Sequence, residues 1–281
     1  MRRLLALDID GTLLDPSDIV TPVVRAAIAE ARAQDVAVAL ATGRRLRSTR
    51  RVVEELGIQL PLVLSNGALI WDSAAEAPLR EAIFTPELIA AALEASLAAG
   101  LAPILLQGPL HGERIVVPAG EPLEQYARAF GRAWLDVEAV PAASLPQTAE
   151  VLTIDLFGPH RPVRAVTDGL AARGLSIFHT GPHQVGGVAH LWAANIHMSG
   201  VSKAAAVARL AADLGLTMAD VVAVGDGEND LPLLEAAGIG VAMGNAAPEV
   251  RARADAVVRG HDADGVAEAI ERFVLNRQAA D

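Results

Sequence analysis

Short apolar runs alternate with longer amphipathic stretches at both ends of the chain, and this alternation predicts strands and helices in turn. Before residue 80, the expected strands are 4–8, 36–42 and 61–65, and the expected helices are about 22–33 and 45–56. From Ser199 onward, helices are expected at about 202–214, 230–238, 247–253 and 264–275, and strands at 221–226, 239–243 and 255–258. Because strands and helices that alternate in this way form parallel βαβ units, the two ends of the chain should build one α/β core.

Two helix boundaries are marked by single residues. Thr21 is followed by Pro22, which is the pairing of an N-cap hydroxyl with proline at the first helical position. Gly57 follows the helix expected at 45–56 and is the residue type that most often ends a helix.

The middle of the chain follows another pattern, in which strands come in pairs and the helices between them are isolated. Strands are expected at 101–107, 113–119, 151–157, 175–180 and 187–193, and helices at about 86–99, 122–130 and 162–173. This arrangement is typical of an α+β unit with a mostly antiparallel sheet. We therefore expect a core domain of residues 1–82 and 190–281, with a second domain of residues 83–189 inserted into it.

Composition narrows the range of partners. The net charge is −11 and the sequence pI is about 5.1, which argues against nucleic acid and anionic membranes, since both require a basic face. The chain has no cysteine, and no apolar stretch approaches the roughly 20 residues that span a bilayer. A cytoplasmic protein without disulfides is the expectation, and its oligomeric state, monomer or homodimer, stays open.

Polar residues follow four of the expected core strands: Asp8 and Asp10, then Thr42, Gly43 and Arg44, then Ser65 and Asn66, and finally Asp226 to Asp230. In an open parallel sheet, ligands bind at the carboxyl ends of the strands. Each group alone could be an ordinary polar turn, but four groups at one edge indicate a binding site.

Two pairs of carboxylates belong to this edge: Asp8 with Asp10, and Asp226 with Asp230. Residues two apart on a strand point the same way, so Asp8 and Asp10 could converge where their strand ends. A helix cap, an Asx turn or a glycosyltransferase-type metal site would also explain that pair. If all four groups share one crevice, their repulsion calls for protonation or for a cation, and few hard oxygen ligands favour Mg²⁺.

Lys203 is the only lysine, and the other 22 basic residues are arginines. It lies near the start of a helix that Ser199 or Ser202 could cap, where the helix dipole disfavours a cation. An exposed, merely tolerated lysine is the alternative. A compact ammonium group that offsets carboxylate repulsion and binds an anion is the interpretation we favour. Thr42 and the N–H groups around Gly43 would add neutral donors for a phosphoryl group.

Five segments together resemble the motifs of the haloacid dehalogenase (HAD) superfamily, in the same order: "DIDGTLLD" from Asp8's strand, "ATGR", "SNGA", "SGVSK" and "GDGENDLPLL". The tail "AGIGVAMGNAAPEVRARADAVV" and the later "DADGV" resemble the Cof-type (type IIB) hydrolases. The resemblance covers about 1–80 and 192–281, and it implies a Rossmann-like, doubly wound parallel-sheet core with an inserted α+β cap domain. The chain departs from the family in having "WAANIHMSG" where an acidic residue is usual and Ala204 where glycine is frequent, which puts the hinge or the substrate rim in doubt.

The resemblance implies a Mg²⁺-dependent phosphatase of small phosphorylated metabolites, with sugar phosphates the first expectation. Asp8 would be the nucleophile that forms an aspartyl-phosphate, and Asp10 the acid and then the base. The implied catalytic set is completed by Thr42 and Lys203. The implied substrate contacts are Gly11, Thr42, Gly43, Arg44, Asn66, Lys203 and Asn229. The implied metal ligands are Asp8, Asp10 through its carbonyl, Asp226 and Asp230.

Two other functions stay open at this point. A phosphomutase on the same scaffold would retain the phosphoryl group, and assays of isomer interconversion would detect it. A non-catalytic metabolite-binding protein is the third possibility, although every implied catalytic position holds a competent residue.

Overall fold

The computed structural model describes residues 3–119, 137–185 and 188–276, with the backbone alone at 182–185 and 188–190. The chain divides into two compact units, one of Met1–Arg80 with Ser202–Asp281 and the other of Glu81–Val201. Among the described residues, no helix is both long enough and apolar enough to cross a membrane. The two units are described separately below.

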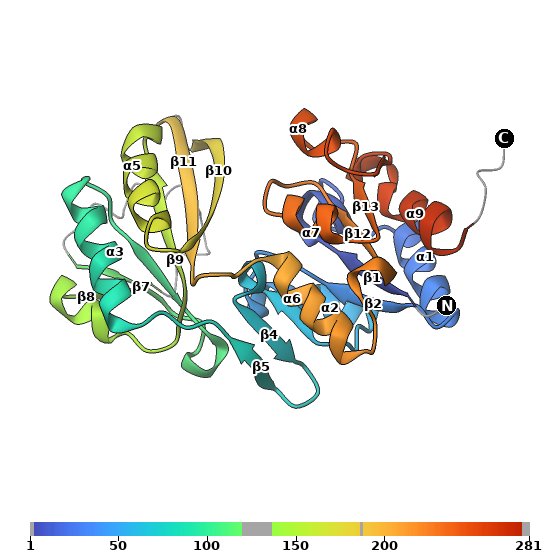
Figure 1. The fold of residues 1–281 in the computed structure, drawn as a ribbon, viewed down its shortest axis with the longest axis horizontal. Coiled ribbons are helices and arrows are strands. Elements are labelled where there is room, and N and C mark those ends of the chain that lie inside the picture. The colour runs from blue at the N-terminus through green and yellow to red at the C-terminus, as the bar shows by residue number, and fades with distance from the viewer. Residues whose placement is uncertain (1–2, 120–136, 186–187, 277–281) are drawn as a thin grey trace. The chain divides into compact units, whose positions relative to one another are not determined.

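The first unit contains a sheet of five parallel strands in the order β14-β13-β12-β1-β2 (Figure 1). Its strands are β1 (Leu4–Leu7), β2 (Ala37–Leu40), β12 (Val221–Gly225), β13 (Ile239–Ala242) and β14 (Ala256–Val257). Leu4 of the central strand β1 pairs with Ala37 on one side and with Val221 on the other. Strands from the two ends of the chain thus lie side by side, which confirms the parallel α/β core.

The helices of this unit are α1 (Pro22–Ala33), α2 (Leu46–Leu56), α6 (Lys203–Asp213), α7 (Leu231–Ala236), α8 (Pro248–Arg251) and α9 (Gly265–Ala269), the last continued by a turn at Ile270–Val274. Helix α1 contacts α2 and α9, whereas α6 contacts α7, so the helices form two groups, as a doubly wound fold requires. Thr21 caps α1, and Gly57 ends α2 in the left-handed conformation, as predicted.

The third expected strand is not part of the parallel sheet. β3 (Leu62–Leu64) forms an antiparallel sheet with β4 (Leu69–Asp72) and β5 (Ala77–Glu81), which the sequence did not predict. Its link to the parallel sheet is a single bridge between Ala41 and Val63. The N–H groups of Ser65 and Asn66 also donate to the carbonyls of Arg44 and Thr42, so the residues after β3 lie beside the loop that follows β2.

The second unit contains a six-stranded sheet in the order β10-β11-β9-β6-β7-β8. Its strands are β6 (Ile104–Gln107), β7 (Ile115–Pro118), β8 (Val137–Val140), β9 (Val151–Gly158), β10 (Ser176–Val185) and β11 (Val188–His197). Its described helices include α3 (Pro86–Ala98) and α5 (His160–Ala171). All pairs are antiparallel except β7 with β8, so the mostly antiparallel sheet is confirmed. The helix expected at about 122–130 lies outside the described residues.

Each unit has a hydrophobic core of its own. The expected domain limit at residues 189–190 needs correction, because it falls inside β11 and the units divide after Val201 instead. The first limit, expected after residue 82, falls after Arg80. Every predicted site residue belongs to the first unit.

Candidate active site

Asp8 and Asp10 follow β1 but diverge. The strand ends at Leu7, and the chain turns tightly at Ile9–Leu13, where Gly11 has a φ of +72°. The backbone N–H of Asp8 still donates to the carbonyl of Val224 at 3.0 Å, and its side chain is buried. The Asp10 side chain is 59% exposed and is paired with Arg44. Convergence of the two carboxylates, expected from strand geometry, is therefore not observed, because the turn begins between them.

Lys203 is buried, with 1% of its surface exposed. Its Nζ donates to Asp8 Oδ1 and to Asp230 Oδ1, each at 2.6 Å. Ser202 caps α6 by accepting the N–H of Ala205, so Lys203 is the first residue of that helix. Burial lowers the pKa of Lys203, but the two carboxylates outweigh it and raise the pKa above its ordinary value. The alternative of an exposed, tolerated lysine is excluded.

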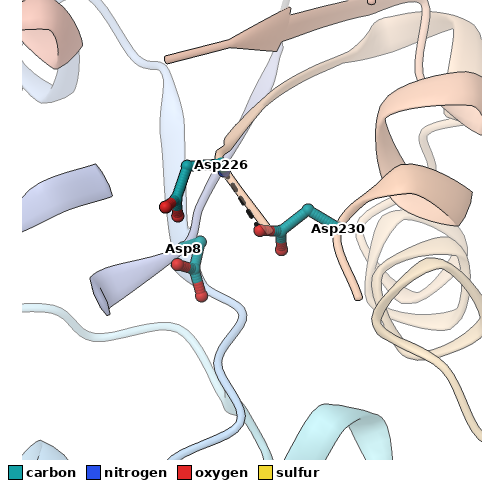
Figure 2. Close-up of side chains that lie close together, drawn as sticks. All are labelled: Asp8, Asp226 and Asp230. Atoms are coloured by element: carbon teal, nitrogen blue, oxygen red, sulfur yellow. Dashed lines mark hydrogen bonds between the residues drawn. The ribbon is translucent and has the colours of Figure 1, made fainter. Parts of the chain in front are cut away.

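The loop after β12 brings in the other two carboxylates. Asp230 Oδ2 accepts the backbone N–H groups of Asp226 at 3.2 Å and Gly227 at 2.9 Å, which closes the loop. Asp226 Oδ1 accepts from the Thr12 hydroxyl at 3.1 Å, so the loop is tied to the turn after β1. Figure 2 shows Asp8, Asp226 and Asp230 grouped together.

These three aspartates fit a divalent cation. One carboxylate oxygen from each lies within 4.8 Å of the others. Burial raises the pKa of Asp8 to about 8 even though Lys203 opposes it, and burial together with Asp230 raises the pKa of Asp226 to about 6. One ammonium group therefore does not neutralise the cluster, and a cation held by hard oxygen ligands would favour the ionised forms. The Asp10 side chain lies outside this group.

Two glycines lie where the side chains of Asp226 and Asp230 pass close to the backbone, and a larger residue would not fit at either position. A Cβ atom on Gly11 would lie 2.3 Å from Asp226 Oδ2, and one on Gly225 would lie 2.6 Å from Asp230 Cγ. Both distances are far below van der Waals contact. The absence of these two side chains lets the carboxylates gather at the strand ends.

Neutral polar groups come from the loops after β2 and β3. Thr42 is fully buried, and its hydroxyl accepts the backbone N–H of Arg44 at 3.1 Å. Asn66, with a φ of +55°, donates its backbone N–H to the carbonyl of Thr42. Its Oδ1 accepts from Asn229 Nδ2 at 2.9 Å, and a Cβ on Gly43 would lie 3.1 Å from that same oxygen. The structure thus brings together Thr42, Gly43, Asn66 and Asn229 as a second cluster.

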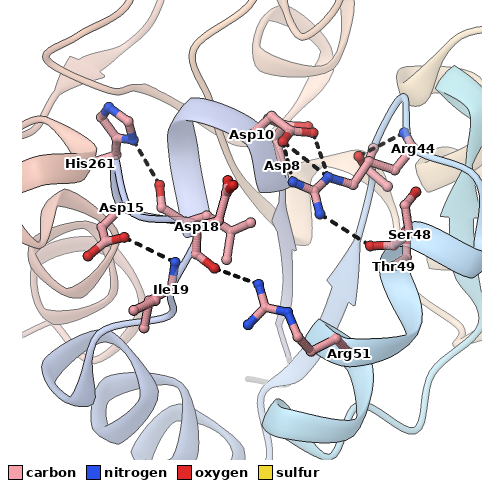
Figure 3. A network of polar contacts seen from close by, with 12 residues as sticks. Asp8, Asp10, Asp15, Asp18, Ile19, Arg44, Ser48, Thr49, Arg51 and His261 are labelled. Atoms are coloured by element: carbon pink, nitrogen blue, oxygen red, sulfur yellow. Dashed lines mark hydrogen bonds and ion pairs between the residues drawn. The ribbon is translucent and has the colours of Figure 1, made fainter. Parts of the chain in front are cut away.

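Arg44 does not point into either cluster. Its Nε donates to Asp10 Oδ1 at 3.1 Å and to Oδ2 at 2.8 Å, and its Nη2 donates to Oδ1 at 2.5 Å (Figure 3). Its Nη1 donates to the carbonyl of Ser48, at 3.2 Å. The hydrogen bond to Asp10 is the main reason why the pKa of Arg44 is raised.

Asn245 was not among the predicted site residues. Its Nδ2 donates to the carbonyl of Gly11 at 2.8 Å and lies 3.4 Å from Asp226 Oδ2, and its Oδ1 accepts the N–H of His261 at 2.9 Å. The signal was present in the sequence, because Asn245 follows the strand expected at 239–243 as the other polar groups follow theirs. From the sequence, Asn245 is noted only as part of the segment "AGIGVAMGNAAPEVRARADAVV" that resembles the Cof-type hydrolases.

Comparisons with known proteins identify the family of this chain. The sequence profile of the haloacid dehalogenase-like hydrolases matches residues 5–117 and 188–270. The 5-amino-6-(5-phospho-D-ribitylamino)uracil phosphatase of Bacillus subtilis is 28% identical, with 97% of this chain and 96% of the relative covered. A phosphoglycolate phosphatase of Natronomonas pharaonis is 31% identical, with 97% of this chain and 98% of the relative covered. The pyridoxal phosphate phosphatase of Escherichia coli is 30% identical, with 97% of this chain and 99% of the relative covered.

Solved structures extend the similarity to the whole fold. A HAD-superfamily phosphatase from Bacteroides thetaiotaomicron superposes with a TM-score of 0.83 at 25% identity, with 97% of this chain and 95% of that chain covered. A HAD subclass IIB sugar phosphatase shares the fold with a TM-score of 0.79 at 23% identity, with 96% of this chain and 98% of that chain covered. The profile match, the relatives and the fold show that this chain is an enzyme of the haloacid dehalogenase-like hydrolase family.

Proposed function

We propose that this enzyme is a Mg²⁺-dependent phosphatase that hydrolyses small phosphate monoesters through a phosphoryl intermediate on Asp8. The observation that carries the proposal is the buried contact between Lys203 and Asp8, at 2.6 Å. A buried carboxylate beside an ammonium group and a cation site is a nucleophile held next to the charges that a phosphate ester would need.

The proposed reaction has two steps. In the first, an oxygen of Asp8 attacks phosphorus, the bond to the leaving oxygen breaks, and that oxygen takes a proton from Asp10. In the second, Asp10 accepts a proton from water, the water oxygen attacks phosphorus, and the bond to Asp8 breaks to give inorganic phosphate. Lys203 and Thr42 would hold the phosphoryl oxygens, with Gly43 and Asn66 beside them.

The residues that would hold Mg²⁺ are Asp8, Asp226, the carbonyl of Asp10 and, in support, Asp230 and Asn229. When bound, the ion would supply positive charge that offsets repulsion between the phosphate and the aspartates. Asp230 already accepts two backbone N–H groups and Lys203, which suits a supporting position.

The substrate class is proposed from the relatives. Their names assign three different phosphate monoesters to them: a phosphorylated ribitylamino-uracil, phosphoglycolate and pyridoxal phosphate. The shared part is a phosphoryl group on a small metabolite, and we propose the same for this enzyme. Sugar phosphates belong first in the panel, as the sequence suggested.

The test is phosphate release from a broad panel of phosphorylated metabolites and from p-nitrophenyl phosphate, with and without Mg²⁺. We expect turnover by the wild type that needs the metal, and none by Asp8→Asn. Release by neither protein from any compound would refute a phosphatase and favour the mutase or the binding protein.

A further inference from the structure

Arg44 donates hydrogen bonds to the Asp10 carboxylate through two of its nitrogen atoms. Nε contacts both carboxylate oxygens, and Nη2 contacts Oδ1. The carboxylate is otherwise well exposed, and an exposed side chain of this length rotates freely unless something holds it. In this structure the guanidinium fixes its direction.

Arg44 is itself held by three further hydrogen bonds. Its Nη1 donates to the carbonyl of Ser48 in the first turn of α2. Its backbone N–H donates to the Thr42 hydroxyl, and its backbone carbonyl accepts the N–H of Ser65. The guanidinium therefore links Asp10 to the first turn of α2, while Thr42 and Ser65 hold the Arg44 backbone; Figure 3 shows the guanidinium between Asp10 and Ser48.

The two oxygens of Asp10 accept different numbers of hydrogen bonds from Arg44, and this leaves Oδ2 able to accept one more. Asp10 Oδ1 accepts two N–H donors and Oδ2 accepts one. A carboxylate oxygen has room for about two donors, so Oδ2 can accept another hydrogen bond. A guanidinium that donates to both oxygens also fixes the plane of the carboxyl group, because its N–H donors are held in a rigid, planar arrangement.

We propose that Arg44 is a positioning residue that holds Asp10 as a proton acceptor, and that it serves the second half-reaction more than the first. The proposal rests on the proposed function. In that half-reaction, water donates its proton to Asp10 Oδ2 while its oxygen attacks phosphorus, and the Asp8–phosphorus bond breaks with its electrons returning to Asp8. Arg44 aims Oδ2 at the water and does not itself contact the phosphoryl group.

This assignment differs from a phosphate-binding role for Arg44. A phosphate-binding arginine would act on substrate affinity and on the first phosphoryl transfer. A residue that only orients Asp10 for water would leave formation of the intermediate fast and slow its breakdown, so the phosphoryl enzyme would accumulate.

The experiment is stopped-flow and acid-quench kinetics with p-nitrophenyl phosphate, whose leaving group needs little help from an acid. In Arg44→Met we expect a burst of p-nitrophenol close to one equivalent of enzyme, a steady state slowed by about 10²-fold, and an increased phosphoryl adduct by mass spectrometry. Arg50→Met is the matched control, because Arg50 is a nearby arginine on α2 and its pair with the exposed Glu76 is long, at 3.8 Å. It should behave as the wild type.

Arg44→Lys keeps the positive charge but cannot donate to Asp10 from two nitrogen atoms, so we expect the phosphoryl enzyme to accumulate in part. The same measurements on Arg44→Lys test the proposal if Arg44→Met does not fold. A first turnover slowed as much as the steady state, with no adduct, would overturn the proposal and assign Arg44 to phosphate binding. Unchanged kinetics in both variants would also overturn it. A wild type that neither turns over nor forms an adduct would instead refute the proposed function, and this proposal with it.

Discussion

Lys203 compensates two buried carboxylates at once, so its removal should affect stability as well as catalysis. In Lys203→Met, Asp8 and Asp230 would keep their burial without their shared partner. Breaking a buried pair in this way costs about 3–5 kcal/mol. Urea denaturation should show that loss, and phosphate release should be abolished.

A double variant separates the two effects. Lys203→Met with Asp230→Asn removes one of the uncompensated charges, so we expect it to recover part of the stability and none of the activity. A Lys203→Met protein as stable as the wild type would contradict the account of this buried cluster.

Gly11 offers a second prediction at the scale of one residue. In Gly11→Ala the new methyl group would collide with Asp226, and Gly11 also has a positive φ. We expect the Mg²⁺ concentration for half-maximal activity to rise by 10-fold or more, in the range of about 10–100-fold known for groups that orient metal ligands. Gly215→Ala is the control, since Gly215 has nearly the same φ, +73°, with open space around it. An equal metal response in the two variants would rule out the steric argument.

How far the sequence predicts single residues depends on what each one needs. Asp8, Asp226 and Lys203 could be grouped from the sequence because they follow or precede elements whose ends meet in any parallel sheet. The direction of Arg44 could not, since it depends on the distance between two loops that no pattern encodes. The divergence of Asp10 from Asp8 was missed because the strand ends one residue earlier than expected.

At the scale of elements, local signals were reliable. Thr21 caps α1, as predicted, and its hydroxyl also donates to Asp264 beside α9, which the sequence could not reveal. β4 and β5 were missed because their pairing with β3 depends on contacts such as Leu62 with Trp71, and not on a periodic pattern. The third expected strand does meet the end of β2 through the parallel bridge of Ala41 with Val63, but its ladder is formed with β4.

The two roles of Thr21 give a prediction for Thr21→Ala. Loss of an N-cap alone costs about 1 kcal/mol, and the contact with Asp264 should raise the total. Thr85→Ala is the matched control, because Thr85 caps α3 from the equivalent position through a longer hydrogen bond, at 3.4 Å. Urea denaturation should show a greater loss for Thr21→Ala; an equal or smaller loss would mean that Asp264 adds nothing.

At the scale of the whole molecule, we expect Glu81 in the second unit to give the stability a pH dependence that is separate from the aspartate cluster. Burial, with Glu150 beside it, raises the pKa of Glu81 from 4.5 to about 7, and His111 opposes the shift. Oε1 of Glu81 and Oε1 of Glu150 are both buried with no hydrogen-bond partner, while Glu150 Oε2 contacts His111. A proton on Glu81 that is donated to Glu150 would give both oxygens a partner.

The sign of the effect follows from where that proton is bound. Between pH 4.5 and about 7 the folded chain retains a proton that the unfolded chain has lost, so the stabilisation is full below 4.5 and disappears as pH rises through about 7. We expect the Tm to fall between pH 5.5 and 8, and to fall less in Glu81→Gln. Glu94→Gln, at an exposed position on α3, is the control. The same pH slope in all three proteins would contradict this account.

The organisation of the whole chain was predictable in outline, because the change from alternating to paired strands is visible in the sequence. The exact limit of the second unit was not, since β11 continues past the expected limit and the units separate only after Val201. A cytoplasmic location and the absence of a nucleic-acid partner stay predictions from composition.

The central claim is that phosphate passes through a covalent bond to Asp8, and it can be tested by mapping that bond. The wild type would be mixed with Mg²⁺ and the best substrate of the panel, quenched in acid during turnover, digested and analysed by mass spectrometry. We predict a phosphoryl group on the peptide that contains Asp8, and neither adduct nor turnover in Asp8→Asn. Turnover that continues in Asp8→Asn, or an adduct on another residue, would contradict the account.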